Sequence, residues 1–230
     1  MKCGMRKSSD ENLTSSRKAL NVSERGPSTG SPEYYLNSYH PLGETQEGKR
    51  IVQKESLPPF IDASIRREPD FQSPYPSITG LCRCNRLVGP AKTGDFIAYV
   101  TAKRDGVRQM VAILQVVEKL SNHQEAAAWY RRKRLSLPRN CMVAENPALP
   151  LALAVPPPGV TNHSEWDASY KWRAENYPSF LICKPLELNL YDPPVVPETI
   201  FGHSFPNTQV PKRLSAEDFS KLKNLLNEER

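Results

Sequence analysis

The sequence predicts an α+β protein of short strands and packed helices. Two observations predict this class: the distribution of proline, and two strand-like runs followed by a helix. The chain has 230 residues and 22 prolines, almost twice the usual content of about 5%. Nine fall at or before Pro90, none lies between Pro90 and Pro138, and 13 fall from Pro138 to Pro211. This distribution excludes one compact helical bundle and marks loops around a proline-free centre.

The proline-free segment between Pro90 and Pro138 predicts a β-hairpin. Residues 96–101 (FIAYVT) form a β-branched and aromatic run of strand length, and the polar stretch 103–106 predicts a turn. The second run, Met110–Leu120, is rich in valine and isoleucine, which favours a strand. Its apolar residues also lie near helical spacing, so a helix is the alternative. Short strands are expected later, at 180–183 and 186–191.

Three capping-box patterns predict helices. Ser121 and Gln124 precede an alanine-rich helix that ends before Pro138, and Ser164 and Asp167 open a second helix. A third box, 215–218, precedes an amphipathic stripe of about three turns. We expect this last helix to dock on the protein's own core, because isolated helices of this length are marginal. A partner surface is the alternative.

Composition divides the chain into three parts. Residues 1–50 are polar and without periodicity, which predicts a disordered or weakly ordered segment, although Tyr34–Tyr39 contains an apolar island that can dock on the folded part. Residues 51–200 form the expected folded domain, and 201–230 form a linker and the C-terminal amphipathic helix.

Several classes of protein are disfavoured. The first residues lack the apolar core of a signal peptide, and the longest apolar run is too short to span a bilayer, so we expect a cytoplasmic protein without membrane contact. Common phosphate-loop, dinucleotide and hydrolase motifs are missing, and no cofactor is expected. Cys82, Cys84, Cys141 and Cys183 do not form two metal-binding pairs, so we expect reduced thiols and no metal.

The charge distribution points to nucleic acid. Residues 61–140 contain 14 Lys and Arg against 7 Asp and Glu, and clustered cations suit a phosphate backbone. Aromatic rings lie between the cations, where they can stack on bases or, alternatively, pack in the core. The candidate nucleic-acid-binding residues are Arg66, Arg67, Arg83, Arg86, Trp129, Arg131, Arg132, Lys133, Arg134, Trp166 and Trp172.

A set of short motifs resembles the bacterial nucleotide-modification-associated domains. The motifs are Arg66–Phe71, Gly94-Asp95 before a strand, 111–118, the Ala-Ala-Trp helix, and Asn140–Val143 with Asn146-Pro147. Those domains are similar to the PUA-like superfamily, which includes the EVE, ASCH and YTH domains. The resemblance covers about residues 57 to 155. It implies a small curved PUA-like β-barrel with packed helices and a pocket for a modified base.

The expected function is therefore non-enzymatic binding of DNA or RNA, including recognition of a modified base. A base-processing enzyme on the same barrel, with Asp95 or Glu118 as general base, is one alternative. A protein-interaction module that docks through its C-terminal helix is another. The sequence leaves the oligomeric state open.

Overall fold

The computed structural model describes residues 30–82, 85–208 and 210–228. The predicted disorder of residues 1–29 lies outside this part. Residues 30–50, expected to be weakly ordered, contain strand β1 (Tyr34–Tyr39) and the start of helix α1 (Gln46–Glu55). The apolar island at 34–39 thus docks on the fold as a strand of the sheet.

The described residues form one mixed sheet of six strands in the order β2-β5-β4-β3-β1-β6. β1 and β3 are parallel, and the other neighbours are antiparallel. The remaining strands are β2 (Ser77–Thr79), β3 (Phe96–Thr101), β4 (Met110–Leu120), β5 (Phe180–Leu188) and β6 (Lys212–Leu214). The remaining helices are α2 (Asn85–Val88), α3 (His123–Arg132), α4 (His163–Asn176) and α5 (Ala216–Glu228).

The expected PUA-like β-barrel is wrong, because the sheet is open. Its edge strands, β2 and β6, are three residues long and each pairs with one neighbour in the sheet. Closure requires these edges to pair with each other, and in the described residues β2 pairs with β5 and β6 with β1, not with each other. The α+β class itself is correct.

The predicted hairpin is confirmed, and the second run is a strand. β3 and β4 pair antiparallel, with Phe96 opposite Gln115 and Val100 opposite Met110. The run at 180–183 and the first part of the run at 186–191 form the single strand β5, which continues through Pro185 and ends at Leu188. Register shifts between β4 and β5 accompany the curvature of the sheet.

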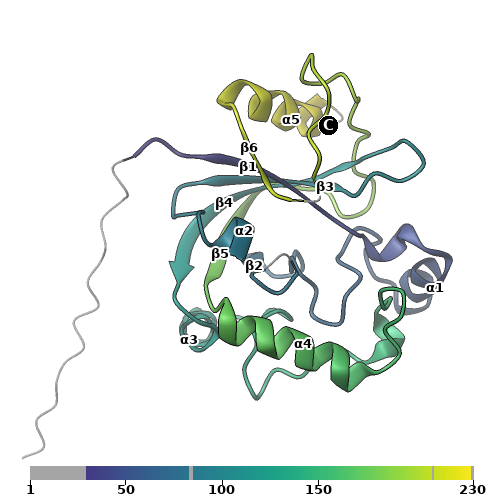
Figure 1. The fold of residues 1–230 in the computed structure, drawn as a ribbon, viewed down its shortest axis with the longest axis vertical. Coiled ribbons are helices and arrows are strands. Elements are labelled where there is room, and N and C mark those ends of the chain that lie inside the picture. Colours follow the sequence, from purple (N-terminus) through teal and green to yellow (C-terminus); the bar gives the residue numbers. More distant parts are fainter. Residues whose placement is uncertain (1–29, 83–84, 209, 229–230) are drawn as a thin grey trace, which may run out of the picture.

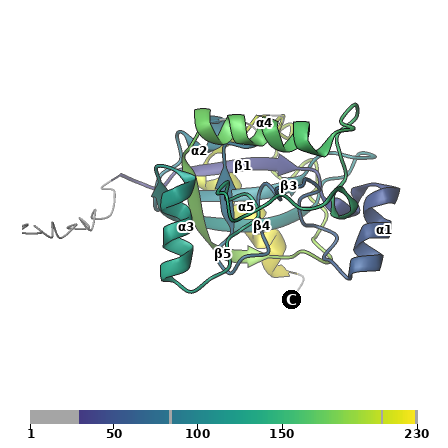
Figure 2. The ribbon, with the colours of Figure 1, turned by 90° about the horizontal axis from the view of Figure 1, so that it is seen from below.

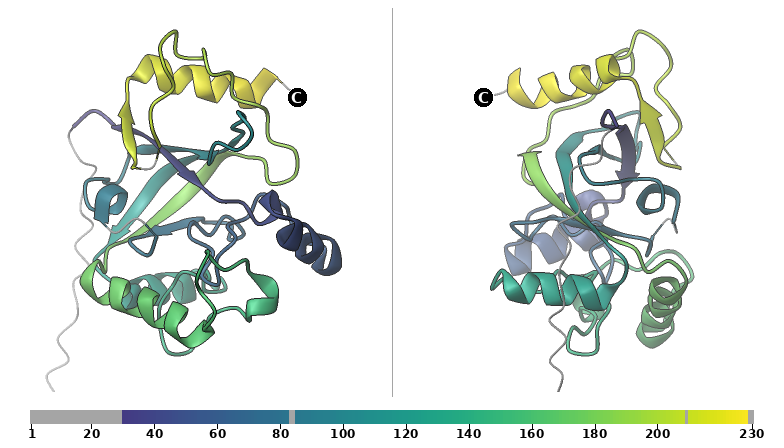
Figure 3. Two further views of the ribbon diagram at one scale, coloured as in Figure 1. Left: turned by 45° about the vertical axis from the view of Figure 1, so that its right-hand side comes forward. Right: turned by 90° about the vertical axis from the view of Figure 1, so that its left-hand side faces the viewer.

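Helices and loops cover the two faces of the sheet differently. Strand alternation sends Leu36, Ala98 and Val100 to one face, where they pack against α5. Tyr35, Ile97 and Tyr99 point to the other face. Figure 1 and the left view of Figure 3 show α5 on the first face and α3 and α4 beyond the second. In Figure 2, α4 runs across that second face, with α3 at one end and α1 at the other.

Candidate functional site: a cavity between the sheet and helix α4

A cavity of about 470 Å³ lies between the second face of the sheet and α4. Strands β1, β2 and β3 contribute one wall, and α4 contributes Trp166 and Tyr170. The turn at 62–69, the proline loop at 155–158 and the segment 40–45 contribute most of the other lining residues. This volume falls in the range of small-ligand sites, about 300–1,000 Å³.

Asn37 places an unpartnered polar atom in this wall. It lies in β1 on the same face as the buried rings of Tyr35 and Tyr39, and its own side chain is buried. Its Nδ2 donates to the Tyr99 hydroxyl at 3.2 Å, whereas its buried Oδ1 has no hydrogen-bond partner. A buried acceptor without a donor is costly, so a ligand N–H at this position would gain a hydrogen bond at little cost to the protein.

Glu68 is a buried carboxyl group in the same lining. Its Oε1 accepts a hydrogen bond from the Thr79 amide at 2.8 Å, and its Oε2 accepts from the Thr79 hydroxyl at 2.5 Å and from Asn140 Nδ2 at 2.9 Å. Burial raises its pKa to about 8, although these hydrogen bonds oppose the rise. The carboxyl group therefore holds its proton at neutral pH.

Asp62 shapes the turn that carries Glu68. Its Oδ1 accepts from the amides of Ser64 at 2.9 Å and Glu68 at 3.0 Å, and burial raises its pKa. Arg67 fastens the same turn, because its Nη1 donates to the Asp62 carbonyl and its Nη2 to the Leu153 carbonyl, both at 2.6 Å. Local hydrogen bonds within the turn, and one long-range bond from Arg67 to Leu153, therefore hold this part of the cavity wall.

Aromatic rings and apolar groups make up most of the remaining lining. Trp166 and Tyr170 are mostly buried between the cavity and a cluster that includes Ile65 and Leu81. Among the described lining residues there is no Lys or Arg. A flat, uncharged ring with a few hydrogen-bonding groups fits such a lining better than a phosphate does.

Two of the sequence-predicted arginines are in the interior. Arg66 is 3% exposed, and its Nε donates to Asp167 Oδ1 at 2.7 Å while its Nη1 donates to the Asn146 carbonyl at 2.7 Å. Arg67 is 2% exposed and donates to carbonyl oxygens as described above. Both side chains bind the protein's own groups.

One other candidate, Arg86, is next in sequence to a residue that lines the cavity. Arg83 is outside the described residues. Arg86 is exposed on α2, directly before the lining residue Leu87. Arg173 donates from Nη1 to the Leu81 carbonyl at 2.6 Å, next to the lining residue Cys82. Arg173 therefore holds the segment that lines this part of the cavity, and Arg86 is an exposed cation that precedes a lining residue in sequence.

The α3 candidates form a separate surface. Arg131 pairs with Glu145, and Arg132, Lys133 and Arg134 are exposed. Trp129 is 7% exposed, and its Nε1 donates to Glu118 Oε2 at 3.3 Å, so its ring packs in the core. These residues are not among those that line the cavity.

The structure separates the three predicted tryptophans by role. Trp166 lines the cavity, whereas Trp129 packs under α3. Trp172 is 55% exposed on α4 and contacts the Tyr177 ring edge-on, with centroids 6.1 Å apart. One of the three rings is therefore in the candidate site.

The catalytic alternatives, Asp95 and Glu118, have structural partners elsewhere. Asp95 accepts from the amides of Glu33 and Lys92, both at 2.9 Å, which fixes the turn before β3. Glu118 accepts from Trp129 as above. In the described residues, neither carboxylate is among the cavity lining.

The structure also bears on whether the chain can bind a metal ion or cross a membrane. Cys141 and Cys183 are buried free thiols and Cys82 is an exposed one; Cys84 lies outside the described residues. Across the described part of the chain, no group of three or more His, Cys, Asp or Glu is placed to hold a metal ion. No described helix combines the length and apolar character needed to cross a bilayer.

Sequence reasoning missed Asn37, Asp62 and Glu68 as site residues. A polar residue within the apolar run Tyr34–Tyr39 is the signal that could have identified Asn37. Glu68 and Asp62 carried no comparable signal, because their burial depends on β2, the 140 region and the 153 loop. Models of known protein families give no match to the chain, and neither do curated proteins.

Proposed function

We propose that this protein binds nucleic acid and takes one unpaired or flipped base into the cavity between the sheet and α4. The unpartnered Oδ1 of Asn37 is the observation that carries the proposal. An exocyclic amine or ring N–H of a base would donate to it. Trp166 and Tyr170 provide apolar ring surface for the base, as in other proteins that hold extruded bases.

The protonated state of Glu68 adds to the recognition of a base. A neutral carboxyl group can donate as well as accept, so it complements the edge of a base without attracting a cation. The cavity volume also leaves room for substituents on the ring. We therefore include modified bases among the ligands.

Arg86 is the cation best placed for the phosphate next to the bound base. It is exposed and next in sequence to a lining residue, and Arg173 holds the segment that lines this part of the cavity. Phosphate contacts release counterions, so affinity falls steeply with salt. Arg86→Glu is expected to lower the slope of log K against log salt by about 1.

The decisive experiment compares oligonucleotides with and without one base. Fluorescence anisotropy would measure binding of single-stranded and duplex DNA and RNA, with modified bases and with a single abasic site, over a salt series. Asn37→Leu is expected to weaken binding of the base-containing strand about tenfold. The abasic strand should bind wild type and variant equally. Salt-insensitive binding, or an equal loss on both strands, contradicts the proposal.

A base-processing enzyme is the second candidate, because a carboxyl group with a pKa of about 8 in a cavity can transfer a proton at neutral pH. Incubation with oligonucleotides that carry modified bases, followed by mass spectrometry, separates the two functions. A change in mass that Glu68→Gln abolishes supports the enzyme. An unchanged, bound oligonucleotide supports the binding protein.

A further inference from the structure

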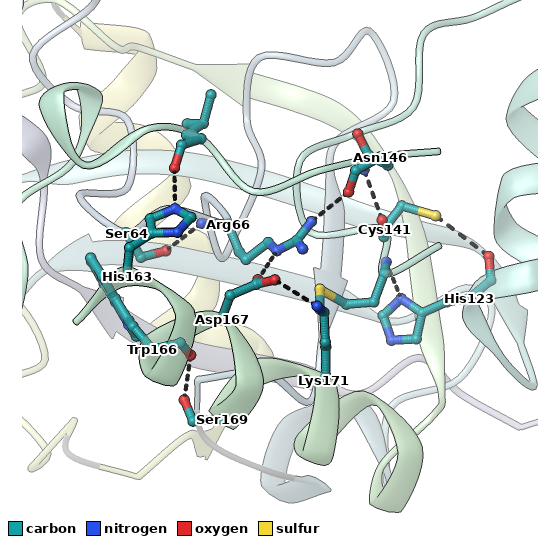
Figure 4. A network of polar contacts seen from close by, with 12 residues as sticks. Ser64, Arg66, His123, Cys141, Asn146, His163, Trp166, Asp167, Ser169 and Lys171 are labelled. Carbon is teal, nitrogen blue, oxygen red and sulfur yellow. Dashed lines mark hydrogen bonds and ion pairs between the residues drawn. The ribbon is translucent and has the colours of Figure 1, made fainter. Parts of the chain in front are cut away.

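A second cavity, of about 660 Å³, lies on another side of α4. It is bounded by the start of α3, the segment 142–148 and α4. Figure 4 shows the polar side chains of this region. The ones used below are Arg66, His123, Asp167 and Lys171, all of which line the cavity.

His123 has a hydrogen-bond donor without a partner here. Its Nδ1 lies 3.1 Å from the Met142 amide nitrogen, which donates to it. A backbone N–H can only donate, so Nδ1 carries no proton and the neutral ring has its proton on Nε2. The side chain is 3% exposed, and Nε2 has no hydrogen-bond partner. In Figure 4 that nitrogen is on the side of the ring facing α4.

The ring stays neutral at physiological pH. Burial, with a smaller contribution from the nearby charge of Arg66, lowers the pKa of His123 to about 4. The group therefore presents one fixed N–H donor and no positive charge of its own. Such a donor suits an oxygen acceptor on a ligand.

Two cations share one carboxylate beside this donor. Arg66 Nε donates to Asp167 Oδ1 at 2.7 Å, and Lys171 Nζ lies 3.3 Å from Asp167 Oδ2. The Lys171 side chain is 64% exposed, so its ammonium can turn toward a ligand. The other ionisable lining groups are His163, whose Nε2 is bonded to the Leu149 carbonyl, and Glu175. The positive end of the α3 dipole adds to the field.

We propose that this cavity is a second binding site, for an oxyanion of the phosphate type. One oxygen accepts from His123 Nε2–H, and the remaining charge faces the exposed ammonium of Lys171, while Arg66 stays paired with Asp167. This inference does not depend on the base-binding cavity. The phosphate can be a free anion or part of a nucleic-acid backbone.

Inorganic phosphate is the probe for the test. Ring ¹⁵N NMR spectra of the full chain at pH 7 would follow the His123 Nε2 signal during a phosphate titration. We expect a saturable shift with a Kd of roughly 1–10 mM. Lys171→Gln should raise that Kd at least about threefold. Lys49→Gln is the matched control, because Lys49 is an exposed lysine on α1 and is not among the residues that line this cavity.

Each outcome bears on the site. Absence of a shift at His123, or a Kd that Lys171→Gln leaves unchanged in a variant with wild-type melting temperature, overturns the proposal. A saturable shift weakened by Lys171→Gln supports it. If phosphate then displaces a bound single-stranded oligonucleotide, the ligand of this cavity is a phosphate of the nucleic-acid backbone. If phosphate and the oligonucleotide bind at the same time, the ligand of this cavity is a free anion.

Discussion

Arg66 and Arg67 show how strongly the surroundings decide the role of a side chain. As adjacent cations in a basic segment they suggested phosphate contacts, yet both guanidinium groups are buried. Arg67 donates locally to the Asp62 carbonyl, but the other acceptors, Asp167 and the carbonyls of Asn146 and Leu153, lie 80 or more residues away in sequence. A buried cation needs such partners, and no local pattern reveals acceptors at that separation.

Removal of the charge of Asp167 should destabilise the fold. Burial alone would raise the pKa of this carboxyl group, but the hydrogen bond and charge of Arg66, together with Lys171, lower it. Asp167→Asn leaves Arg66 as a buried cation without its anion, and we expect a loss of about 3 kcal/mol in the free energy of unfolding by urea. Lys171→Gln removes the exposed partner and should cost under about 1 kcal/mol. Equal losses in the two variants would contradict this account.

Glu68 should make the free energy of unfolding fall as pH rises. Its pKa is raised from 4.5 to about 8 in the folded protein, so the folded state binds more protons than the unfolded state between these values. The free energy of unfolding therefore falls as pH rises through this window, by about 1.4 kcal/mol for each unit of pKa difference.

Glu68→Gln tests this pH dependence, because its amide stays neutral at every pH. Urea unfolding at about pH 5 and about pH 8.5 should show a smaller fall for Glu68→Gln than for wild type. Glu47→Gln, at an exposed site on α1, should keep the wild-type fall. Parallel pH profiles of wild type and Glu68→Gln would exclude the raised pKa.

At the scale of elements, the predicted hairpin and helices are largely right, with shifts at the helix starts. The box at Ser121 is displaced by one residue, since Asn122 caps α3 by accepting from the Glu125 amide at 2.8 Å. Asn162 rather than Ser164 caps α4. The box at Ser215 is confirmed, because its hydroxyl accepts from the Asp218 amide at 3.0 Å. Capping is local in sequence, so its signals are readable within a residue or two.

The docking of α5 on the protein's own core is confirmed. Phe219, Leu222 and Leu226 pack with sheet residues such as Leu36 and Val100. Leu222 is fully buried, so Leu222→Ala should cost about 2–5 kcal/mol in thermal or urea unfolding. Lys223→Ala, on the exposed side of α5, should change stability by less than about 0.5 kcal/mol. A wild-type melting temperature for Leu222→Ala would instead favour the partner surface.

At the scale of the whole molecule, the basic excess of the middle third is divided between interior and surface. Arg66 and Arg67 are inside, and Lys119 Nζ donates to the carbonyls of Gly89 and Ala91 at 2.6 and 2.9 Å. Arg132, Lys133 and Arg134 stay exposed at the end of α3. The net charge of a segment therefore overstates the charge that a nucleic acid meets.

The α3 surface should still add to binding if the strand extends past the cavity. Arg131→Glu with Arg132→Glu is expected to lower the slope of log K against log salt by about 1–2 for a long oligonucleotide. The matched control is Lys49→Glu with Arg50→Glu, an exposed adjacent pair on α1 at the other end of the sheet. Equal decreases in both double variants would show that general charge, and not this surface, governs binding.

Whether the sheet is open or closed could not be predicted from the sequence. Alternation and turns predict strands, but they do not specify which edges pair. β1 was missed as a strand and inserts between β3 and β6, and β2 and β6 are too short to give a periodic signal. The barrel was expected from the resemblance of short motifs alone, and the observed strand order overturns it.

The sequence by itself determined the central hairpin, the helix-forming segments and the docking of the C-terminal helix. These depend on interactions between residues a few positions apart, or on an apolar stripe that any core would bury. Only the tertiary structure decided the open sheet, the burial of Arg66 and Arg67, and the two cavities beside α4. Those features join residues such as Asn37 and Tyr99, 62 positions apart, and Arg66 and Asp167, 101 apart. Burial and long-range hydrogen bonds set their chemistry, and both arise when the chain brings distant segments together.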